Sequence, residues 1–273
     1  MKALRLLLQL GLIGLSFVWL YPLLWMLSAS FKTESEFFRN NFRLWPSRLD
    51  FSSYERAWQA GRFELYFVNS IVITASVILL VLLISAVSGY AIGRYSFRGK
   101  ATVVSVLTAS VFVPIESAII PIFQLIKDMG LLNSLLGVIL AEAGGGNILF
   151  VLLFAGFFRQ VPKELGEAAV VDGCGFLRTF WTVMLPIAKP VVGSVVVMQF
   201  IWCWNSFLMP LVLTLGNPEL RTVAVGLYAL KGENVVDWSG IAAGGVITLV
   251  PVIIVFLSLQ RLFVNGLAGA VKG

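Results

Sequence analysis

The fold is decided by residues 159–189, which read RQVPKELGEAAVVDGCGFLRTFWTVMLPIAK. This is the longest polar stretch of the chain, and strongly apolar segments flank it on both sides. Pro162 suits a first helical turn, and Glu164 and Glu167 place negative charge near the positive end of the helix dipole. Gly173 stands where a left-handed cap is needed, so we predict a short helix that ends at this glycine.

A second short helix is predicted after the glycine. Its apolar residues recur at helical spacing on one face and are Phe176, Phe180, Val183 and Met184. Pro186 and Pro190 are expected to close this helix. We interpret residues 159–189 as a helical hairpin with an exposed apolar face, held against one side of a membrane, and therefore as a docking surface. A purely structural interfacial helix is the alternative.

The composition excludes most soluble and catalytic classes. Of the 273 residues, 59% are hydrophobic and only 12% are charged, whereas ordinary globular domains carry about 25% charge. The chain has no histidine, and its two cysteines, Cys174 and Cys203, form no CxxC pair, so we expect no metal site. The net charge of +6 indicates membrane topology rather than nucleic-acid binding, because the basic residues border apolar segments.

Six apolar segments are long enough for a membrane-spanning helix, which needs about 20 such residues. They lie near residues 6–31, 67–93, 101–126, 134–158, 190–215 and 239–261. No internal repeat or low-complexity linker divides the chain, so we predict an all-α polytopic membrane protein, with one transmembrane domain over residues 1–273. The first segment also resembles a signal peptide, but its length favours a retained helix.

The orientation follows from the basic residues. With a cytoplasmic N-terminus, the inner segments carry eleven Lys and Arg against three acidic residues, and the outer segments carry nine against eleven. The positive-inside rule therefore places both termini and the 159–189 hairpin in the cytoplasm and the 32–64 loop outside. The aromatic residues of that loop are typical of an interfacial anchor or of a partner contact.

Polar and irregular positions interrupt the predicted spans. Glu116 and Glu142 lie in the third and fourth spans, and counting at about 1.5 Å per residue places both near the outer boundary. We interpret them as carboxylates at the membrane interface or at the mouth of a cavity, with a role in an outer gate as the alternative. Pro114 and Pro121 predict a broken third span, and the glycines at 144–146 predict a kink in the fourth.

The fifth span carries Trp202, Trp204 and Asn205. Aromatic rings stack on sugar faces and an amide bonds hydroxyl groups, so these residues suit a neutral, hydroxylated ligand. Ordinary packing between helices is the competing interpretation.

A spaced motif in the hairpin carries a family resemblance. Glu167-Ala168-Ala169 is followed after three residues by Gly173, after nine more by Val183, and after one more by Leu185-Pro186. This resembles the EAA signature of ABC-importer permeases (EAA, x3, G, x9, I, x, LP), with valine in place of isoleucine. Residues 204–211 (WNSFLMPL), Asn69-Ser70 at the start of the second span and the C-terminal VKG resemble the carbohydrate-uptake, maltose-type branch.

The resemblance implies the ABC type I importer permease architecture in a bacterial or archaeal cytoplasmic membrane. It also implies three partners: a homologous second permease, an ATPase dimer that binds ATP and Mg²⁺, and an extracytoplasmic sugar-binding protein. This chain would itself bind no cofactor. The ATPase-coupling residues would be Glu167, Ala168, Ala169, Asp172, Gly173, Leu185 and Pro186. A possible ATPase-contacting tail comprises Gly269, Lys272 and Gly273, and a possible substrate path comprises Asn69, Trp202, Trp204 and Asn205.

Two other classes fit the residues less well. A secondary transporter or channel predicts ionisable residues at the midplane or an inverted repeat, and an integral membrane enzyme needs a catalytic set. The sequence has no phosphate-binding Gly-rich loop with Lys and Ser or Thr, so ATP hydrolysis must come from another chain. We therefore predict a non-catalytic translocation subunit of an ATP-driven sugar importer, with an oligosaccharide as the expected substrate.

Overall fold

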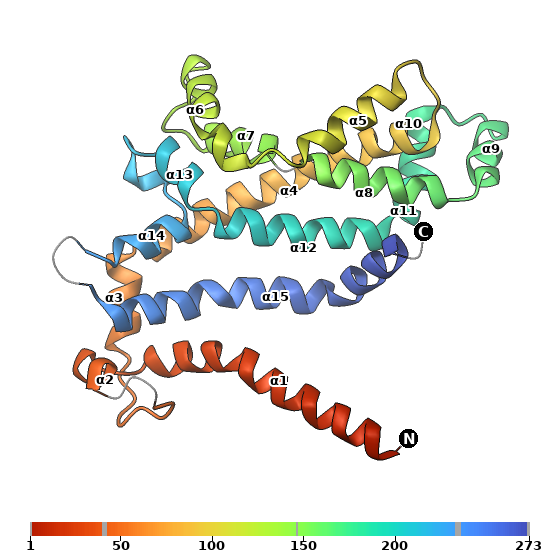
Figure 1. The fold of residues 1–273 in the computed structure, drawn as a ribbon. Helices are drawn as coiled ribbons and strands as arrows, with labels where there is room; N and C mark the ends of the chain where they lie inside the picture. Colours follow the sequence, from red (N-terminus) through yellow and green to blue (C-terminus); the bar gives the residue numbers. More distant parts are fainter. Residues whose placement is uncertain (1, 40–42, 146, 233–235, 272–273) are drawn as a thin grey trace. The chain divides into compact units, whose positions relative to one another are not determined.

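The computed structural model describes residues 2–39, 43–145, 147–232 and 236–271, and every regular element in those ranges is a helix (Figure 1). The long helices are α1 (Lys2–Ala29), α4 (Phe63–Arg94) and α15 (Trp238–Val271). The shorter ones before the hairpin are α2 (Glu34–Arg39), α3 (Ser52–Ala60), α5 (Lys100–Ser110), η1 (Ile115–Ala118), α6 (Ile119–Asp128), α7 (Leu135–Gly145) and α8 (Asn147–Gln160). The remaining ones are α9 (Lys163–Val171), α10 (Phe176–Thr179), π-helix η2 (Phe180–Met184), α11 (Leu185–Ile187), α12 (Lys189–Asn205), α13 (Leu208–Leu213), η3 (Pro218–Leu220) and α14 (Val223–Ala229). The all-α prediction is confirmed.

The number of spans is less regular than the hydrophobic segments suggested. Within the described ranges, α1, α4 and α15 are each long and apolar enough to cross a membrane. Two bent pairs raise the number to five if each counts as one span: α7 with α8, bent by 52°, and Phe176–Ile187 with α12, bent by 79°. The count of six spans stays a prediction.

The expected third span, residues 101–126, is not one helix. It is divided between α5, η1 and α6, with Pro114 in the segment between α5 and η1. The predicted break at Pro114 is thus confirmed, whereas Pro121 lies in the first turn of α6, where proline is tolerated. The predicted kink of the fourth span is also found, since α7 ends at Gly145 and α8 begins at Asn147.

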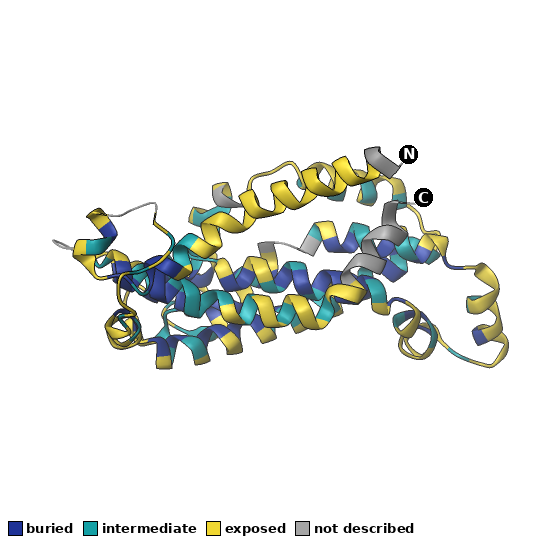
Figure 2. Cartoon of the chain, turned by 90° about the horizontal axis from the view of Figure 1, so that it is seen from below, coloured by how far each residue is buried: buried dark blue, intermediate teal, exposed yellow. Residues whose placement is uncertain are grey.

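The chain forms two compact units. The first comprises Met1–Phe67 and Val223–Pro251. In it, Phe37 and Ala242 pack on Ala29 at the end of α1, and Arg56 of α3 forms a 2.8 Å ion pair with Asp237. From Arg5 to Leu24, α1 is exposed, as Figure 2 shows for the helix that begins at the N label. An apolar helix exposed on all sides is typical of a chain that needs lipid or another subunit around it.

The second unit comprises Val68–Thr222 and Val252–Gly273 and holds the larger core. Here α4 approaches α8 closely through two glycines one turn apart, Gly89 and Gly93. A Cβ added at Gly93 would lie 2.8 Å from the carbonyl oxygen of Ala155 and 2.9 Å from Cβ of Phe158. This small-xxx-small contact lets two membrane helices meet at their backbones. It positions the C-terminal ends of α4 and α8 beside the 159–189 hairpin.

Candidate functional site

The first helix of the hairpin, α9, begins and ends close to the predicted residues. Pro162 is its N-cap, and the helix runs from Lys163 to Val171. Gly173 has φ of +76°, the left-handed conformation that the sequence predicted. The N–H of Cys174 donates to the carbonyl of Ala169 at 2.8 Å, and that of Gly173 donates to Val170 at 2.9 Å. This pair of bonds is a Schellman motif, so the glycine ends α9 and turns the chain.

The exposed surface of α9 is apolar at its end and acidic along its length. Val171 is 86% exposed and Val170 is 65% exposed, whereas Ala169 is buried. Of the other predicted coupling residues, Glu167, Ala168, Asp172 and Gly173 are exposed. Figure 1 shows α9 beyond the end of α8, set apart from the core helices of its unit. This arrangement presents a short helix that can enter a groove in another protein.

The second part of the hairpin differs from the prediction. Phe180 and Met184 are fully buried, so the apolar face predicted to be a docking surface packs inside the chain instead. The ring centroids of Phe176 and Phe180 lie 4.9 and 5.6 Å from that of Tyr90 in α4. Apolar periodicity identifies a buried face, but it does not identify the covering partner, which here is the protein itself.

The second helix ends between Pro186 and Pro190, as the sequence predicted. The chain is helical from Phe176 through a π-helical turn to Ile187, one residue beyond Pro186, and Pro190 lies in the first turn of α12. The direction then changes by 79° at Ala188. Leu185 is half-buried and Pro186 is exposed, so the end of the EAA-like signature lies at this bend.

The four candidates for a substrate path divide into two pairs. Trp202 and Asn205 share one exposed face of α12: the Trp202 ring stacks on Phe150 at 5.2 Å, and Asn205 Nδ2 donates to the Ile201 carbonyl at 2.7 Å. Trp204 is buried and stacks on Phe200 at 5.3 Å. In this conformation only the first pair can meet a ligand without rearrangement, because Asn69 is also buried.

Asn69 serves the protein's own backbone. Its Nδ2 donates to the carbonyl oxygens of Glu219 at 2.7 Å and Arg221 at 3.0 Å, which ties the η3 turn to α4. An amide near the end of a membrane helix is therefore explained here by a loop that returns to it.

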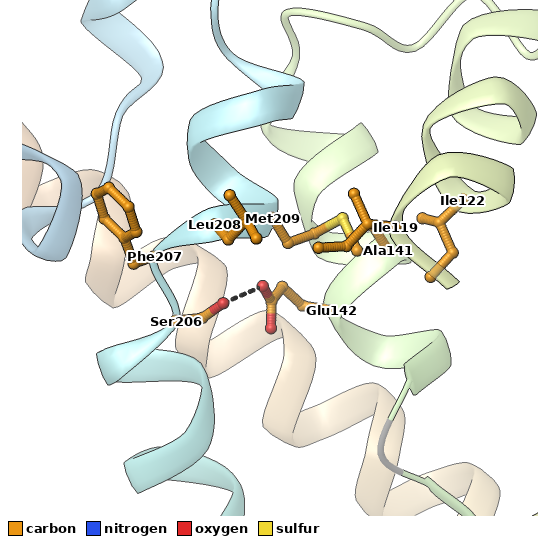
Figure 3. Close-up of a pocket in the computed structure, with 8 residues that line it drawn as sticks. All are labelled: Ile119, Ile122, Ala141, Glu142, Ser206, Phe207, Leu208 and Met209. Atoms are coloured by element: carbon orange, nitrogen blue, oxygen red, sulfur yellow. Dashed lines mark hydrogen bonds between the residues drawn. The ribbon is translucent and has the colours of Figure 1, made fainter. Parts of the chain in front are cut away.

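The structure adds a polar contact that the sequence did not pair. Ser206 Oγ donates to Glu142 Oε1 at 2.6 Å (Figure 3). The two side chains line a hollow of about 240 Å³ whose other walls are apolar: Ile119, Ile122, Ala141, Phe207, Leu208 and Met209. The contact lies beside the ends of two helices, α7 and α12. Glu116 falls in η1, and no group of three acidic or cysteine residues within the described ranges could hold a metal ion.

Two predictions concern the C-terminal tail. Gly269 falls within α15, whereas Lys272 and Gly273 lie outside the described residues. The proposed contact between this tail and an ATPase stays a prediction.

Sequence reasoning missed the importance of Arg94, which it counted only as a topological charge. Its guanidinium donates to three backbone carbonyls at the start of the hairpin. The sequence did contain a pattern that could have identified Arg94. This residue directly follows the glycine pair, Gly89 and Gly93, through which α4 packs closely on α8.

Known proteins match both the sequence and the fold. Residues 83–269 match the family model described as "Binding-protein-dependent transport system inner membrane component". The diacetylchitobiose uptake system permease protein NgcG of Streptomyces coelicolor is 34% identical over 90% of this chain and 82% of its own. The arabinooligosaccharides transport system permease protein AraQ of Halalkalibacterium halodurans is 34% identical over 98% of this chain and 96% of its own.

The fold of this chain also matches that of a solved structure. A chain in the crystal structure of a bacterial ABC transporter that imports the acidic polysaccharide alginate superposes with a TM-score of 0.80. The match covers 96% of this chain and 97% of that one at 23% identity. On the sequence matches, this chain belongs to the inner-membrane components of binding-protein-dependent transport systems, as a permease of the carbohydrate-uptake ABC importers.

Proposed function

We propose that this chain couples ATP hydrolysis by a partner ATPase to sugar translocation through its 159–189 hairpin. The observation that carries the proposal is the surface of α9, where Val170 and Val171 are exposed beside Glu167. Apolar side chains on a cytoplasmic loop have no lipid to cover them, so a protein groove is the partner that they fit. Closing of the ATPase dimer would move α9 and thereby shift the spans between inward-facing and outward-facing states.

The proposal assigns the remaining parts of the importer to other chains. ATP and Mg²⁺ would bind the ATPase dimer, a homologous second permease would complete the channel, and an external binding protein would deliver the sugar. Both termini and the hairpin would lie in the cytoplasm. The exposed apolar length of α1 supports a second membrane subunit, because in the described chain that helix packs only near its end.

An oligosaccharide is the proposed substrate class. The relatives named above are permeases for diacetylchitobiose and for arabinooligosaccharides. On this chain, the exposed pair Trp202 and Asn205 offers a ring for a sugar face and an amide for its hydroxyl groups.

The test is co-purification of the tagged chain with the ATPase from its native membrane. Glu167→Arg and Gly173→Val should each release the ATPase, since one reverses a charge on the α9 surface and the other strains its cap. Asp128→Arg, a charge reversal at an exposed acid at the end of α6, is the matched control and should retain it. Isolation of a chain that never associates with an ATPase and transports sugar alone would refute the proposal.

A further inference from the structure

The last turn of α4 touches both ends of the hairpin. Tyr90 and Arg94 are four residues apart, so they lie on the same face of the helix. Arg94 contacts the start of the hairpin and Tyr90 contacts its returning segment.

Arg94 holds the start of α9 through three backbone carbonyls. Nη1 donates to Val161 at 2.6 Å, and Nη2 donates to Pro162 at 3.1 Å and to Lys163 at 3.3 Å. Charge-assisted hydrogen bonds are stronger and shorter than neutral ones, and the planar guanidinium fixes the direction of each bond. The position of the first turn of α9 is thus fixed to the end of α4.

Gly166 and an adjoining hollow show that α9 is otherwise loosely packed against α4. A Cβ at Gly166 would lie 3.0 Å from Arg94 Nη2, so the glycine admits the guanidinium. Beside this contact is a hollow of about 570 Å³, lined by residues of α4, α8 and α9 that include Gly93, Arg159 and Val170. Because space separates the two helices, close packing cannot transmit a displacement of α9, whereas the Arg94 hydrogen bonds can.

Tyr90 holds the returning segment. Its buried ring contacts Phe176, Phe180 and Phe158, with centroid distances of 4.9, 5.6 and 5.6 Å. Its hydroxyl lies 3.1 Å from that of Tyr95. These rings join α10 and the π-helix η2 to the ends of α4 and α8.

The covalent connections of the hairpin are poorly suited to transmit its displacement to the membrane helices. Pro162 has ψ of 140°, so the link from α8 into α9 is extended. The link from α11 into α12 bends by 79°. In contrast, α4 runs through 32 residues without a proline. A movement of the hairpin would be absorbed at bent or extended links and carried along a continuous helix.

From these contacts we infer that the Tyr90–Arg94 turn of α4 transmits the movement of the 159–189 hairpin to the membrane helices. Arg94 acts as a positioning residue for α9, and Tyr90 acts as a positioning residue for the returning segment. The inference rests on the proposed function, because it requires that an ATPase moves α9. It adds the residues that connect this motion to the membrane.

The first test measures sugar transported per ATP hydrolysed, using the complete importer in proteoliposomes. Arg94→Gln should lower this ratio at least fivefold while the ATPase remains bound, since α9 docks but no longer moves α4. The ratio for Arg94→Lys should lie between those of the unmodified chain and Arg94→Gln, because an ammonium group cannot reproduce the planar three-bond geometry. Arg98→Gln removes the same charge from the exposed loop that follows α4 and should keep the ratio within twofold. A ratio within twofold for Arg94→Gln would overturn the inference.

Tyr90 offers a second, conservative pair of variants. Tyr90→Phe keeps the ring contacts and should retain the ratio, whereas Tyr90→Leu should lower it about threefold or more. Equal ratios for the two variants would contradict the role of the ring.

A distance measurement covers the case in which Arg94→Gln fails to assemble. Spin labels at Leu165 and Leu79, both exposed, report the position of α9 relative to α4 after Cys174 and Cys203 are replaced by serine. In the assembled importer the distance should stay constant on ATP binding, because the two helices move together. A change of several ångströms on ATP binding would overturn the inference. Loss of the ATPase from the unmodified chain would instead refute the proposed function.

Discussion

Ser206 and Glu142 are joined by a hydrogen bond of 2.6 Å that connects the segment after α12 to the last turn of α7. Both residues lie where a helix in an apolar segment is interrupted. Such interruptions survive in a membrane protein only where protein or water covers the backbone. The bond therefore fixes two irregular segments to each other beside the hollow shown in Figure 3.

Removal of the Ser206 hydroxyl should destabilise the chain. Ser206→Ala leaves the Glu142 carboxylate without its donor, at a cost of about 1–3 kcal/mol. Glu142→Gln should cost less, because its amide oxygen still accepts the bond. The measurement is the unfolding midpoint in detergent, with Ser258→Ala as control, since that hydroxyl bonds only its own helix at Ile254. Equal midpoints for Ser206→Ala and Ser258→Ala would contradict the prediction.

Two asparagines should show opposite phenotypes. Asn69→Ala removes both donors that hold η3 and should cost about 1–3 kcal/mol of stability. Asn205→Ala loses one bond within its own helix and should change stability by less than about 0.5 kcal/mol while reducing sugar uptake. The measurements are the unfolding midpoint and the rate of sugar uptake for both variants. A loss of uptake without a loss of stability in Asn69→Ala would contradict the prediction and would support Asn69 as a substrate-path residue.

These two residues show what a sequence can predict for a membrane protein. The lengths of the apolar segments predicted α1, α4 and α15, because the thickness of the membrane sets the number of apolar residues that a spanning helix needs. Gly173 was predicted because its φ of +76° excludes most side chains. Asn69 and Asn205 could not be separated, since lipid and protein interior are both apolar and periodicity does not distinguish them.

The same limit applies to the hairpin. Phe180 and Met184 have the spacing of one helix face, and that face is indeed covered, but by Tyr90 and its neighbours in the same chain. The candidate docking residues Val170 and Val171 are adjacent in sequence and carry no periodic pattern. Their exposure depends on how α9 is held, and hence on Arg94, which is remote in sequence.

Substitutions at two glycines, Gly173 and Gly175, test whether the left-handed cap stabilises α9. Gly173→Ala places a side chain at a left-handed position and should cost about 1–2 kcal/mol locally. Gly175→Ala should cost little, because Gly175 has φ of −76° and open space around it. Hydrogen exchange of the amides in 163–173 should quicken in the first variant alone. Equal exchange in the two variants would show that the left-handed cap does not stabilise α9.

The ion pair between Arg56 and Asp237 should make a contribution to the stability of the first unit that is lost in acid. Partial burial alone would raise the pKa of Asp237, but the Arg56 hydrogen bond, with that from the Gly240 N–H, lowers it below the usual 3.8. The stabilisation is therefore complete above about pH 4 and is lost as the pH falls through the lowered pKa. Because Arg56 is largely exposed, the contribution should stay below about 1 kcal/mol.

The measurement is the difference in unfolding midpoint between the unmodified chain and Arg56→Gln from pH 7 to pH 2. The difference should be constant down to about pH 4 and then shrink. Arg39→Gln, at an exposed arginine of α2, should show no such dependence. A difference that grows in acid would have the wrong sign for a carboxylate with a lowered pKa.

The coupling function is tested most directly by sugar uptake into proteoliposomes that contain this chain with its second permease, ATPase and binding protein. We predict uptake that requires ATP and is abolished by Glu167→Arg, with Asp128→Arg transporting like the unmodified importer. Uptake that continues without ATP, or that is unaffected by Glu167→Arg, would contradict the assignment of α9 as the element that connects the ATPase to transport.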